Sequence, residues 1–586
     1  MLVERYLDRL ATRVIRETLD VDQPPLLRPA KEEKHGDYQV NAAMALGKKL
    51  GKAPREIAGP LAEALAEDEA IARAEVAGPG FVNLFLDPAW IGARLGDDLR
   101  DTESLGIEAV ETPQKVIVDF SSPNIAKQMH VGHLRSTIIG DALCRLLRAV
   151  GHEVVGDNHL GDWGTQFGML IVGMREWGDE AALEADAIVE LERVYRLASA
   201  KNKDDEAFAD AARAELKKLQ DGDADNRALW ERFVNATRVA LDRVYGKLDV
   251  SFDEWLGESA YDAALPGVVD LLLEKGIARE DDGAICVFWN DRKESVVPKR
   301  LKKQRNAAGD PTPFIIRKKD GAYLYSTTDV ATVLHRRDHF ACDRAIYVVD
   351  SRQGPHFDQL FTIMALLGVE MRLEHVGFGV VLDTSGKPIK TRDGKTITLE
   401  SLLDEGVERA KAFLLENEDR LRIDQDRIDD VAAAVGIGAI KYADLHQNRN
   451  TDYQFDWEKM ISLSGNSGPY INYAYARVMN IFVKGGVALE EATGAIALGA
   501  PEELVLGRLL LRYGQVVHAA AETCLPHLVC DHLYEVARAF SAFYEACPVL
   551  KSDGATRESR LALAALTARQ LKAGLGLLGI TAVDRM

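Results

Sequence analysis

The chain has 586 residues, which is enough for about three domains with large cores. Hydrophobic residues make up 47% and charged residues 28%, which is ordinary for a globular protein and excludes a fibrous or disordered chain. The net charge of −20 argues against nonspecific coating of nucleic acid, although a local basic groove for RNA is still allowed. The six cysteines form no C-x-x-C pair, and no apolar run reaches membrane-spanning length. We therefore expect a cytoplasmic protein with reduced thiols and no membrane contact.

Residues 1 to about 110 predict a small α+β domain. Apolar residues recur at helical spacing up to about residue 20. Strand-like sequence ends in EVAGPGFVNLFL (75–86), whose glycine-proline-glycine turn separates two strands. Phe81 and Asn83 alternate on the second of these strands, where they could face a ligand. From spacing alone, an ordinary edge strand is the simpler interpretation.

A strand, a turn and a helix over residues 115–150 predict a ligand site. Lys115–Phe120 is apolar and β-branched, as in a buried parallel strand, and a helical pattern starts at about residue 131. His130, Gly132 and His133 lie where the helix begins. A helix N-terminus offers free N–H groups and a positive dipole end to an anion, and imidazoles can add donors. Gly132 would let a planar group approach the backbone. The pattern therefore favours a phosphate or nucleotide site.

Two other interpretations of the histidine pair remain open. His-x-x-His could be half of a zinc site, but the nearest cysteine, Cys144, is isolated. The two histidines could also be hydrogen-bonded core residues. Their place at the end of a parallel strand, where doubly wound sheets bind ligands, favours the nucleotide site.

The rest of the chain predicts an α/β core followed by helices. Strands and helices alternate over 111–400, which indicates a parallel sheet with right-handed crossovers, and residues 175–340 read as inserted segments. The strands expected in the insertion are AICVFW, PFIIRKK and AYLYS. Residues 401–586 carry only helical patterns, which indicates an all-α bundle that could dock a large partner. The basic loop GKPIKTRDGK (386–395) suits either a phosphate clamp or a surface turn.

Several motifs resemble one family. HVGH (130–133) resembles the HIGH signature of class I aminoacyl-tRNA synthetases, and SSPNIAKQMHVGHLRST (121–137) resembles the bacterial-type arginyl-tRNA synthetases in particular. Four further segments resemble the same family: GDWGTQFG (161–168), LYSTTDVA (324–331), IKYADLHQNRNTDYQFDW (440–457) and GNSGPYINYAYAR (465–477). The resemblance covers nearly the whole chain. One departure is that the chain has no K-M-S-K-S loop.

The resemblance implies a multidomain α/β enzyme. Its parts would be an N-terminal tRNA D-loop-binding domain (1–110), a Rossmann-like catalytic domain (111–400) and an α-helical anticodon-binding domain (401–586). The implied reaction is ATP-dependent attachment of L-arginine to tRNA(Arg) through arginyl-adenylate. Mg²⁺ would enter with ATP rather than in a protein metal site, and the enzyme would be a monomer.

The resemblance also implies roles for individual residues. The predicted catalytic residues are His130, His133, Lys127 and Lys390, because a lysine must replace those of the absent K-M-S-K-S loop. The residues predicted to bind ATP are His130, Gly132, His133, His356, Gln359, Val380 and Lys387. Those predicted to bind arginine are Asp119, Ser122, Asn124, Tyr325, Asp329 and Gln353. Those predicted to contact tRNA are Phe81, Asn83, Tyr475 and Met586.

Asp329 is the main expected acceptor for the guanidinium, although the sequence STTD alone would favour a helix cap there. Three alternative functions fit parts of the pattern. They are a class I synthetase for another amino acid, a nucleotidyltransferase that uses no RNA, and a catalytically silent synthetase-like RNA-binding protein.

Overall fold

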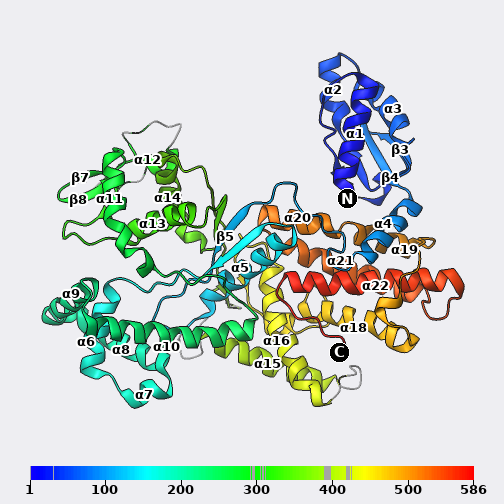
Figure 1. Ribbon diagram of the computed structural model, residues 1–586. Helices are drawn as coiled ribbons and strands as arrows, with labels where there is room; N and C mark the ends of the chain where they lie inside the picture. Colours follow the sequence, from blue (N-terminus) through cyan, green and yellow to red (C-terminus); the bar gives the residue numbers. More distant parts are fainter. Residues whose placement is uncertain are drawn as a thin grey trace.

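The structure is a computed structural model with three parts joined in chain order (Figure 1). It describes residues 2–30, 32–290, 292, 297–303, 305, 309, 312–383, 385–387, 397–417, 423 and 425–586. The N-terminal part stands away from the sheet and the insertion, and the helical part lies between them and the N-terminal part (Figure 1). Within the described part, no helix is both long and apolar enough to cross a membrane.

The N-terminal part is a four-stranded antiparallel sheet with helices packed against it. Its strand order is β1-β2-β4-β3. The elements are α1 (Val3–Leu19), β1 (Arg28–Pro29), η1 (Glu33–His35), β2 (Tyr38–Val40), α2 (Ala42–Leu50), α3 (Pro54–Leu65), β3 (Ile71–Ala77) and β4 (Phe81–Leu86). The next helix, α4 (Pro88–Arg100), packs instead against α19 (Pro501–Leu511) and α22 (Gly554–Leu577) of the helical part. The hairpin predicted at 75–86 is confirmed. Helix α3 was missed by periodicity because its interior contains Gly59-Pro60, a pair that usually marks a turn.

The central sheet is parallel throughout, as predicted, with the strand order β11-β10-β5-β6. Its strands are β5 (Lys115–Asp119), β6 (Glu153–Asp157), β10 (Arg344–Tyr347) and β11 (Arg372–His375), and α5 (Val131–Ala149) joins the first two. Strand β6 lies on one side of β5 and β10 on the other, so the order in which successive strands are added to the sheet reverses at β5. In open α/β sheets, ligands bind outside the carboxyl ends of the strands at such a switch point.

The long insertion lies between β6 and β10 and forms a helical part followed by a small antiparallel sheet, β7-β8-β9. Its helical elements are α6 (Thr165–Trp177), α7 (Glu180–Ala185), α8 (Ala187–Asp204), α9 (Glu206–Gln220), α10 (Ala224–Leu248), η2 (Glu258–Ala264) and α11 (Leu265–Glu274). The remainder are β7 (Arg279–Asp281), β8 (Ala284–Val287), α12 (Lys299–Lys302), β9 (Phe314–Arg317) and α13 (Tyr325–Asp338).

The prediction of a strand at AYLYS (322–326) is wrong, because α13 begins at Tyr325. The hydroxyl of Ser326 donates to the carbonyl of Ile315 at 2.6 Å, and that of Thr327 donates to Ile316. These bonds fix the start of the helix against β9, and local strand propensity gives way to this tertiary contact.

The C-terminal part is a helix bundle whose one short strand among the described residues, β13, pairs with β12 of the preceding segment. Between β10 and the bundle lie η3 (Ser351–Gln353), α14 (Gly354–Leu367) and β12 (Val381–Leu382). The bundle comprises α15 (Leu399–Glu416), η4 (Gln425–Arg427), α16 (Ile428–Leu445), β13 (Tyr453–Gln454), α17 (Trp457–Met460), α18 (Gly468–Gly485), η5 (Leu489–Glu491), α19 (Pro501–Leu511), α20 (Tyr513–Thr523), α21 (His527–Ala546) and α22 (Gly554–Leu577). Helices α16, α20 and α22 pack against α5, so the bundle and the sheet share one core.

Candidate active site

The two histidines of HVGH hold each other in place at the start of α5. The backbone N–H of Gly132 donates to Nδ1 of His130 at 3.0 Å, and the backbone N–H of His130 donates to Nδ1 of His133 at 3.1 Å. The ring centroids are 4.1 Å apart. Because each Nδ1 accepts a bond, we assign the proton of each neutral ring to Nε2. Each ring can therefore donate from Nε2 to an anion.

Both imidazole rings are neutral at neutral pH. Desolvation lowers the pKa of His130, and the positive charge of Lys127 lowers it further. Desolvation, together with the neighbouring His130, lowers the pKa of His133 to about 4. At neutral pH the pair therefore offers hydrogen-bond donors without a positive charge, and any cation at this end of the helix must come from another residue.

Gly132 shapes the start of α5 by leaving room for a neighbouring ring. A Cβ atom on this residue would lie 2.7 Å from Cε1 of the His130 ring. A side chain on Gly132 would thus collide with the His130 ring, and the glycine allows this ring to fold back over the helix start.

The loop between β5 and α5 contains strained backbone. Ser121, Ser122 and Ala126 all have positive φ angles, of 70°, 48° and 61°. Such conformations cost about 1 kcal/mol or more for non-glycine residues and concentrate at functional sites. The loop is held by hydrogen bonds, since Ser121 N donates to the Ser136 hydroxyl at 2.9 Å and Ser122 N donates to Asn158 at 3.1 Å. These hydrogen bonds therefore help to offset the cost of the strained backbone that holds this loop at the edge of the sheet.

Asp119 lies at the carboxyl end of β5 beside a buried arginine. Nη2 of Arg336 is 2.7 Å from Oδ2 of Asp119 and 2.7 Å from Oδ2 of Asp157, the last residue of β6. The Ser122 hydroxyl donates to the other oxygen of Asp119 at 2.9 Å. Sequence reasoning missed Arg336, which is completely buried. The Asp119 carboxylate thus already has a guanidinium partner from the protein.

Asp329, Tyr325 and His356 come together at the same edge of the sheet. Oδ2 of Asp329 is 2.6 Å from Nε2 of His356, and the Tyr325 ring centroid is 5.0 Å from that of His356. Leu324 is the N-cap of α13, so the interpretation of Asp329 as a helix cap is excluded. The side chain of Asp329 is 27% exposed and Tyr325 is 61% exposed, so a ligand could reach both residues.

Glu258 is a second carboxylate in this region that the sequence did not indicate. Its pKa is raised to about 7, mainly by burial and to a smaller extent by the negative charges of Asp329 and Asp162, against the opposing effect of His159. Because the charge of Asp329 affects the pKa of Glu258, this carboxyl group would respond to a cation that binds to Asp329.

The remaining predicted arginine contacts occupy the loops at this edge. Asn124 is exposed and forms a bridge with Gly161 of the GDWGTQFG loop, which brings the two loops together. Gln353 is exposed at the end of η3. Side chains from both sides of the switch point thus surround the place where a ligand would lie.

Three residues predicted to bind ATP, His356, Gln359 and Val380, lie on α14 and in the segment after β11. Gln359 is half-buried on α14, and Val380 N donates to Asp452 at 2.6 Å. Arg135 of α5 braces the segment after β11, because its Nη1 donates to the carbonyl oxygens of Gly379 at 2.8 Å and Thr451 at 3.1 Å. Sequence reasoning missed this buried arginine.

Of the three candidate lysines, the structure describes two. Nζ of Lys127 lies 4.8 Å from the ring centroid of Tyr195, and Lys387 is exposed in a turn closed by Asp383. Lys390 lies outside the described residues. Leu399 N donates to the carbonyl of Met129 at 2.8 Å, so the segment that follows the basic loop pairs with the segment before His130.

The predicted tRNA contacts differ in accessibility. Phe81 is half-buried, whereas Asn83 is 2% exposed and its amide oxygen accepts from Gln39 at 2.7 Å. Tyr475 is 2% exposed and donates to Asp584 at 2.7 Å, and Met586 is 8% exposed. In this structure Tyr475 therefore anchors the segment that follows α22.

Among the described residues, one cluster of three groups could hold a metal ion, namely Asp119, Asp157 and His159. Arg336 already occupies this cluster, because its Nη2 pairs with both carboxylates. The cluster therefore does not fit a resident Mg²⁺ ion.

Three family profiles match consecutive parts of the chain. The profile of the tRNA synthetases class I (R) catalytic domain matches residues 98–457. The arginyl tRNA synthetase N terminal domain matches residues 4–86, and the DALR anticodon binding domain matches residues 471–586.

Curated relatives and solved structures agree with these profiles. The chain is 46% identical to the arginine–tRNA ligase of Laribacter hongkongensis, with 99% of both chains covered. It is 44% identical to that of Proteus mirabilis, with 96% of both covered. The arginyl-tRNA synthetase of Plasmodium falciparum superposes with a TM-score of 0.82 at 28% identity, over 99% of both chains. That of Thermus thermophilus gives 0.82 at 25% identity over 100% of both.

Proposed function

The chain belongs to the class I arginyl-tRNA synthetase family, and from this premise we propose that it activates L-arginine with ATP and transfers the arginyl group to tRNA(Arg). The observation that carries the site assignment is that the start of α5 and the Asp329–His356 pair lie at one edge of a parallel sheet. One feature can hold phosphates, and the other can hold a guanidinium.

In the first step the carboxylate of arginine attacks the α-phosphate of ATP, and pyrophosphate leaves. Because little covalent chemistry falls to the protein, catalysis depends on positioning and on stabilising phosphate charge. Nε2 of His130 and of His133 supplies neutral donors, and we propose that Lys127, Lys387 or Lys390 supplies the positive charge. A ribose hydroxyl of the terminal tRNA adenosine, the 2′-OH in class I, then attacks the adenylate and releases AMP. We propose that Mg²⁺ enters as the ATP complex.

Selection of arginine rests on the acidic groups at the sheet edge. Asp329 offers two acceptor oxygens to a planar guanidinium, and Tyr325 can pack against the side chain. Asp119 contributes negative charge that is shared with Arg336. We propose that Asn124 and Gln353 hold the α-amino group and that Ser122 fixes Asp119, with Gly132, His356, Gln359 and Val380 bordering ATP.

For tRNA, we propose that the N-terminal domain binds the D-loop and the helical domain binds the anticodon, with boundaries near residues 110 and 400. Phe81 is the candidate for stacking on a base, and Asn83 would act through Gln39, which it holds. Tyr475 and Met586 would shape the anticodon surface from beneath. We further propose a cytoplasmic monomer, in agreement with six buried, unbridged cysteines.

The test of this function is the charging of total tRNA by the purified protein with labelled arginine. We expect arginine to be esterified in an ATP-dependent reaction, and lysine and citrulline to be rejected. Arginine-dependent exchange of pyrophosphate into ATP, measured with and without tRNA, separates activation from transfer. Charging of a different amino acid, or binding of tRNA with no exchange, would contradict the proposal.

Glu258 predicts a proton linkage to arginine binding. Its pKa of about 7 is raised partly by the charge of Asp329, and a guanidinium bound there would cancel that effect and lower the pKa. Arginine binding near pH 7 should therefore release a fraction of a proton, and arginine affinity should rise with pH through this range.

Isothermal titration calorimetry in buffers with different ionisation enthalpies would measure this release. Glu258→Gln should abolish it, whereas Asp270→Asn, at an exposed position of α11, should not. Equal proton release by the wild type and Glu258→Gln would remove Glu258 from the site.

A further inference from the structure

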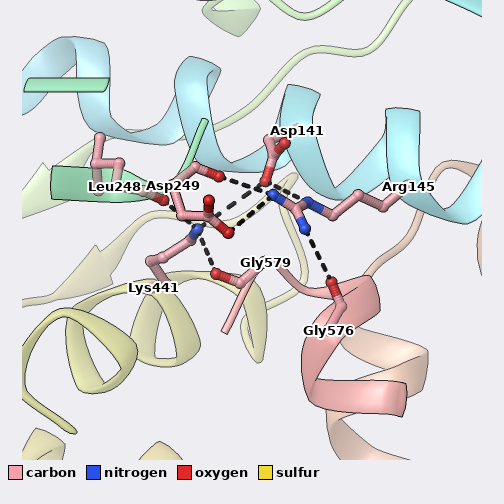
Figure 2. A network of polar contacts seen from close by, with 7 residues as sticks. All are labelled: Asp141, Arg145, Leu248, Asp249, Lys441, Gly576 and Gly579. Carbon is pink, nitrogen blue, oxygen red and sulfur yellow. Dashed lines mark hydrogen bonds and ion pairs between the residues drawn. The ribbon is translucent and has the colours of Figure 1, made fainter. Parts of the chain in front are cut away.

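A buried lysine of the helical domain lies at a junction of four segments (Figure 2). Lys441 is on α16 and is 1% exposed. Its Nζ donates to the carbonyl oxygen of Leu248 at 2.7 Å and to that of Gly579 at 2.6 Å. The same nitrogen is 3.9 Å from Oδ2 of Asp141 on α5. One ammonium group therefore joins the end of α10, the segment after α22 and the helix that carries HVGH.

Arg145 completes the junction from the α5 side (Figure 2). Its Nε donates to Asp141 at 2.9 Å, and its Nη2 donates to the carbonyl of Asp249 at 2.7 Å. Its Nη1 is 3.5 Å from the carbonyl oxygen of Gly576. Lys441 and Arg145 both lie near the buried carboxylate of Asp141. Their hydrogen bonds to carbonyl oxygens link α5 and α16 to the end of α10 and to α22 and the segment after it.

A second ion pair, with its charges the other way round, joins the same two helices nearer the site. Arg135 of α5 pairs with Asp444 of α16 at 3.1 Å, and both side chains are buried. Helix α5 thus offers a cation and then an anion to α16, and α16 offers the complementary charges. Such a pattern resists sliding or rotation of one helix against the other, because any shift separates both buried pairs.

We propose that Lys441 is a positioning residue for arginine activation, which fixes α5 and the imidazoles at its N-terminus to the segment that follows α22. The proposal rests on the proposed function, because the reaction that it positions is the activation step. Donors to a transition state lose much of their effect when they are displaced by about 1 Å. The junction lies between the helical domain and α5, so a change in that domain can reach the site through it.

The segment after α22 offers an independent way to disturb the junction. Gly579 has φ +66°, and a Cβ atom there would lie 2.6 Å from both Asp141 Oδ2 and Lys441 Nζ. Gly486 has φ +60° but has nothing within 4 Å of such an atom. Gly579→Ala and Gly486→Ala thus share the backbone cost, and only Gly579→Ala adds a clash with the junction.

The experiment compares the wild type, Lys441→Met, Lys441→Arg, Gly579→Ala and Gly486→Ala. Pyrophosphate exchange into ATP and aminoacylation of tRNA give kcat and KM. A filter-binding assay gives the affinity for tRNA, and thermal unfolding gives the folded fraction of each variant. We expect Lys441→Met to lower kcat about tenfold, with tRNA affinity and the KM of arginine nearly unchanged. Lys441→Arg should recover part of the loss, and Gly579→Ala should lose several-fold more kcat than Gly486→Ala.

A pH profile separates positioning from a merely structural role. The pKa of Lys441 is lowered to about 8, mainly by burial and also by the charge of Arg145, against the raising effects of Asp141 and Asp249. The wild-type kcat should therefore fall above about pH 8, where the ammonium loses its proton, and this fall should be absent in Lys441→Arg.

Identical pH profiles, or a folded Lys441→Met with wild-type kcat, would overturn the proposal. If Lys441→Met does not fold, the glycine pair decides, and equal kcat in its two variants would overturn the proposal. A wild-type enzyme that charges another amino acid would refute the proposed function instead, and the same variants would then test the junction on that reaction.

Discussion

Replacement of His133 by alanine is expected to lower the rate of arginine activation by about 10²- to 10³-fold, the usual cost of losing one preorganised donor to a developing anion. Nε2 of His133 carries the ring proton, because Nδ1 accepts from the backbone of His130. This donor should contact the phosphate oxygens most strongly in the transition state. Arginine affinity should therefore change little, since only interactions that strengthen on the way to the transition state affect the rate in this way.

Rapid-quench measurement of adenylate formation with tRNA present would give the rate, and calorimetry would give arginine affinity. His133→Asn keeps a hydrogen-bond donor and acceptor in its amide group, so its rate of adenylate formation should fall less than that of His133→Ala. His339→Ala, at an exposed position after α13, is a matched control that should leave the rate unchanged. Equal losses of rate and affinity in His133→Ala would show that the residue maintains the fold of the site rather than the transition state.

The pH dependence gives a second check on His133. Its pKa of about 4 means that the ring is neutral from about pH 5 upward. The folded-state pKa is lower than the unfolded value, so the unfolded chain binds more protons between about pH 6.5 and 4. The contribution of this ring to the free energy of unfolding is therefore lost as the pH falls through that window. The activation rate should show no change near pH 6.5 that is due to His133.

The sequence placed correctly those elements whose residues follow one another directly in the chain. The strand at 115–119, the turn and the histidines at the start of α5 follow one another, so local propensity and capping chemistry suffice to place them. The parallel order of the sheet follows from the alternation of strands and helices.

Arg336 and Glu258 could not be predicted in this way. Arg336 stands in the polar sequence HRRD (335–338), which is typical of an exposed helix end, and its partners are 217 and 179 residues away in the chain. Its complete burial depends on the meeting of β5, β6 and α13, which no local pattern encodes. Glu258 likewise takes its chemical character from residues that only the fold brings near.

The largest effect on substrate binding is expected at Asp329. Asp329→Ala should weaken arginine binding by about 3 kcal/mol, on the order of 10²-fold, because a desolvated guanidinium loses its charged partner. Calorimetry with arginine would measure the change. Asp338→Asn removes an exposed carboxylate at the other end of the same helix and should change arginine affinity by less than about twofold.

A comparison with citrulline separates two possible roles of Asp329. Citrulline has nearly the shape of arginine, but its terminal group is neutral, so it cannot form the ion pair. If Asp329 binds the guanidinium, the wild type prefers arginine strongly, and this preference nearly disappears in Asp329→Ala, because the lost energy belongs to the pair of charges. If Asp329 serves only to hold His356, 2.6 Å away, both ligands lose affinity equally and the KM of ATP rises as well. The binding constants of the two ligands for the two proteins therefore decide whether Asp329 recognises the charge of the substrate or only holds the imidazole of His356.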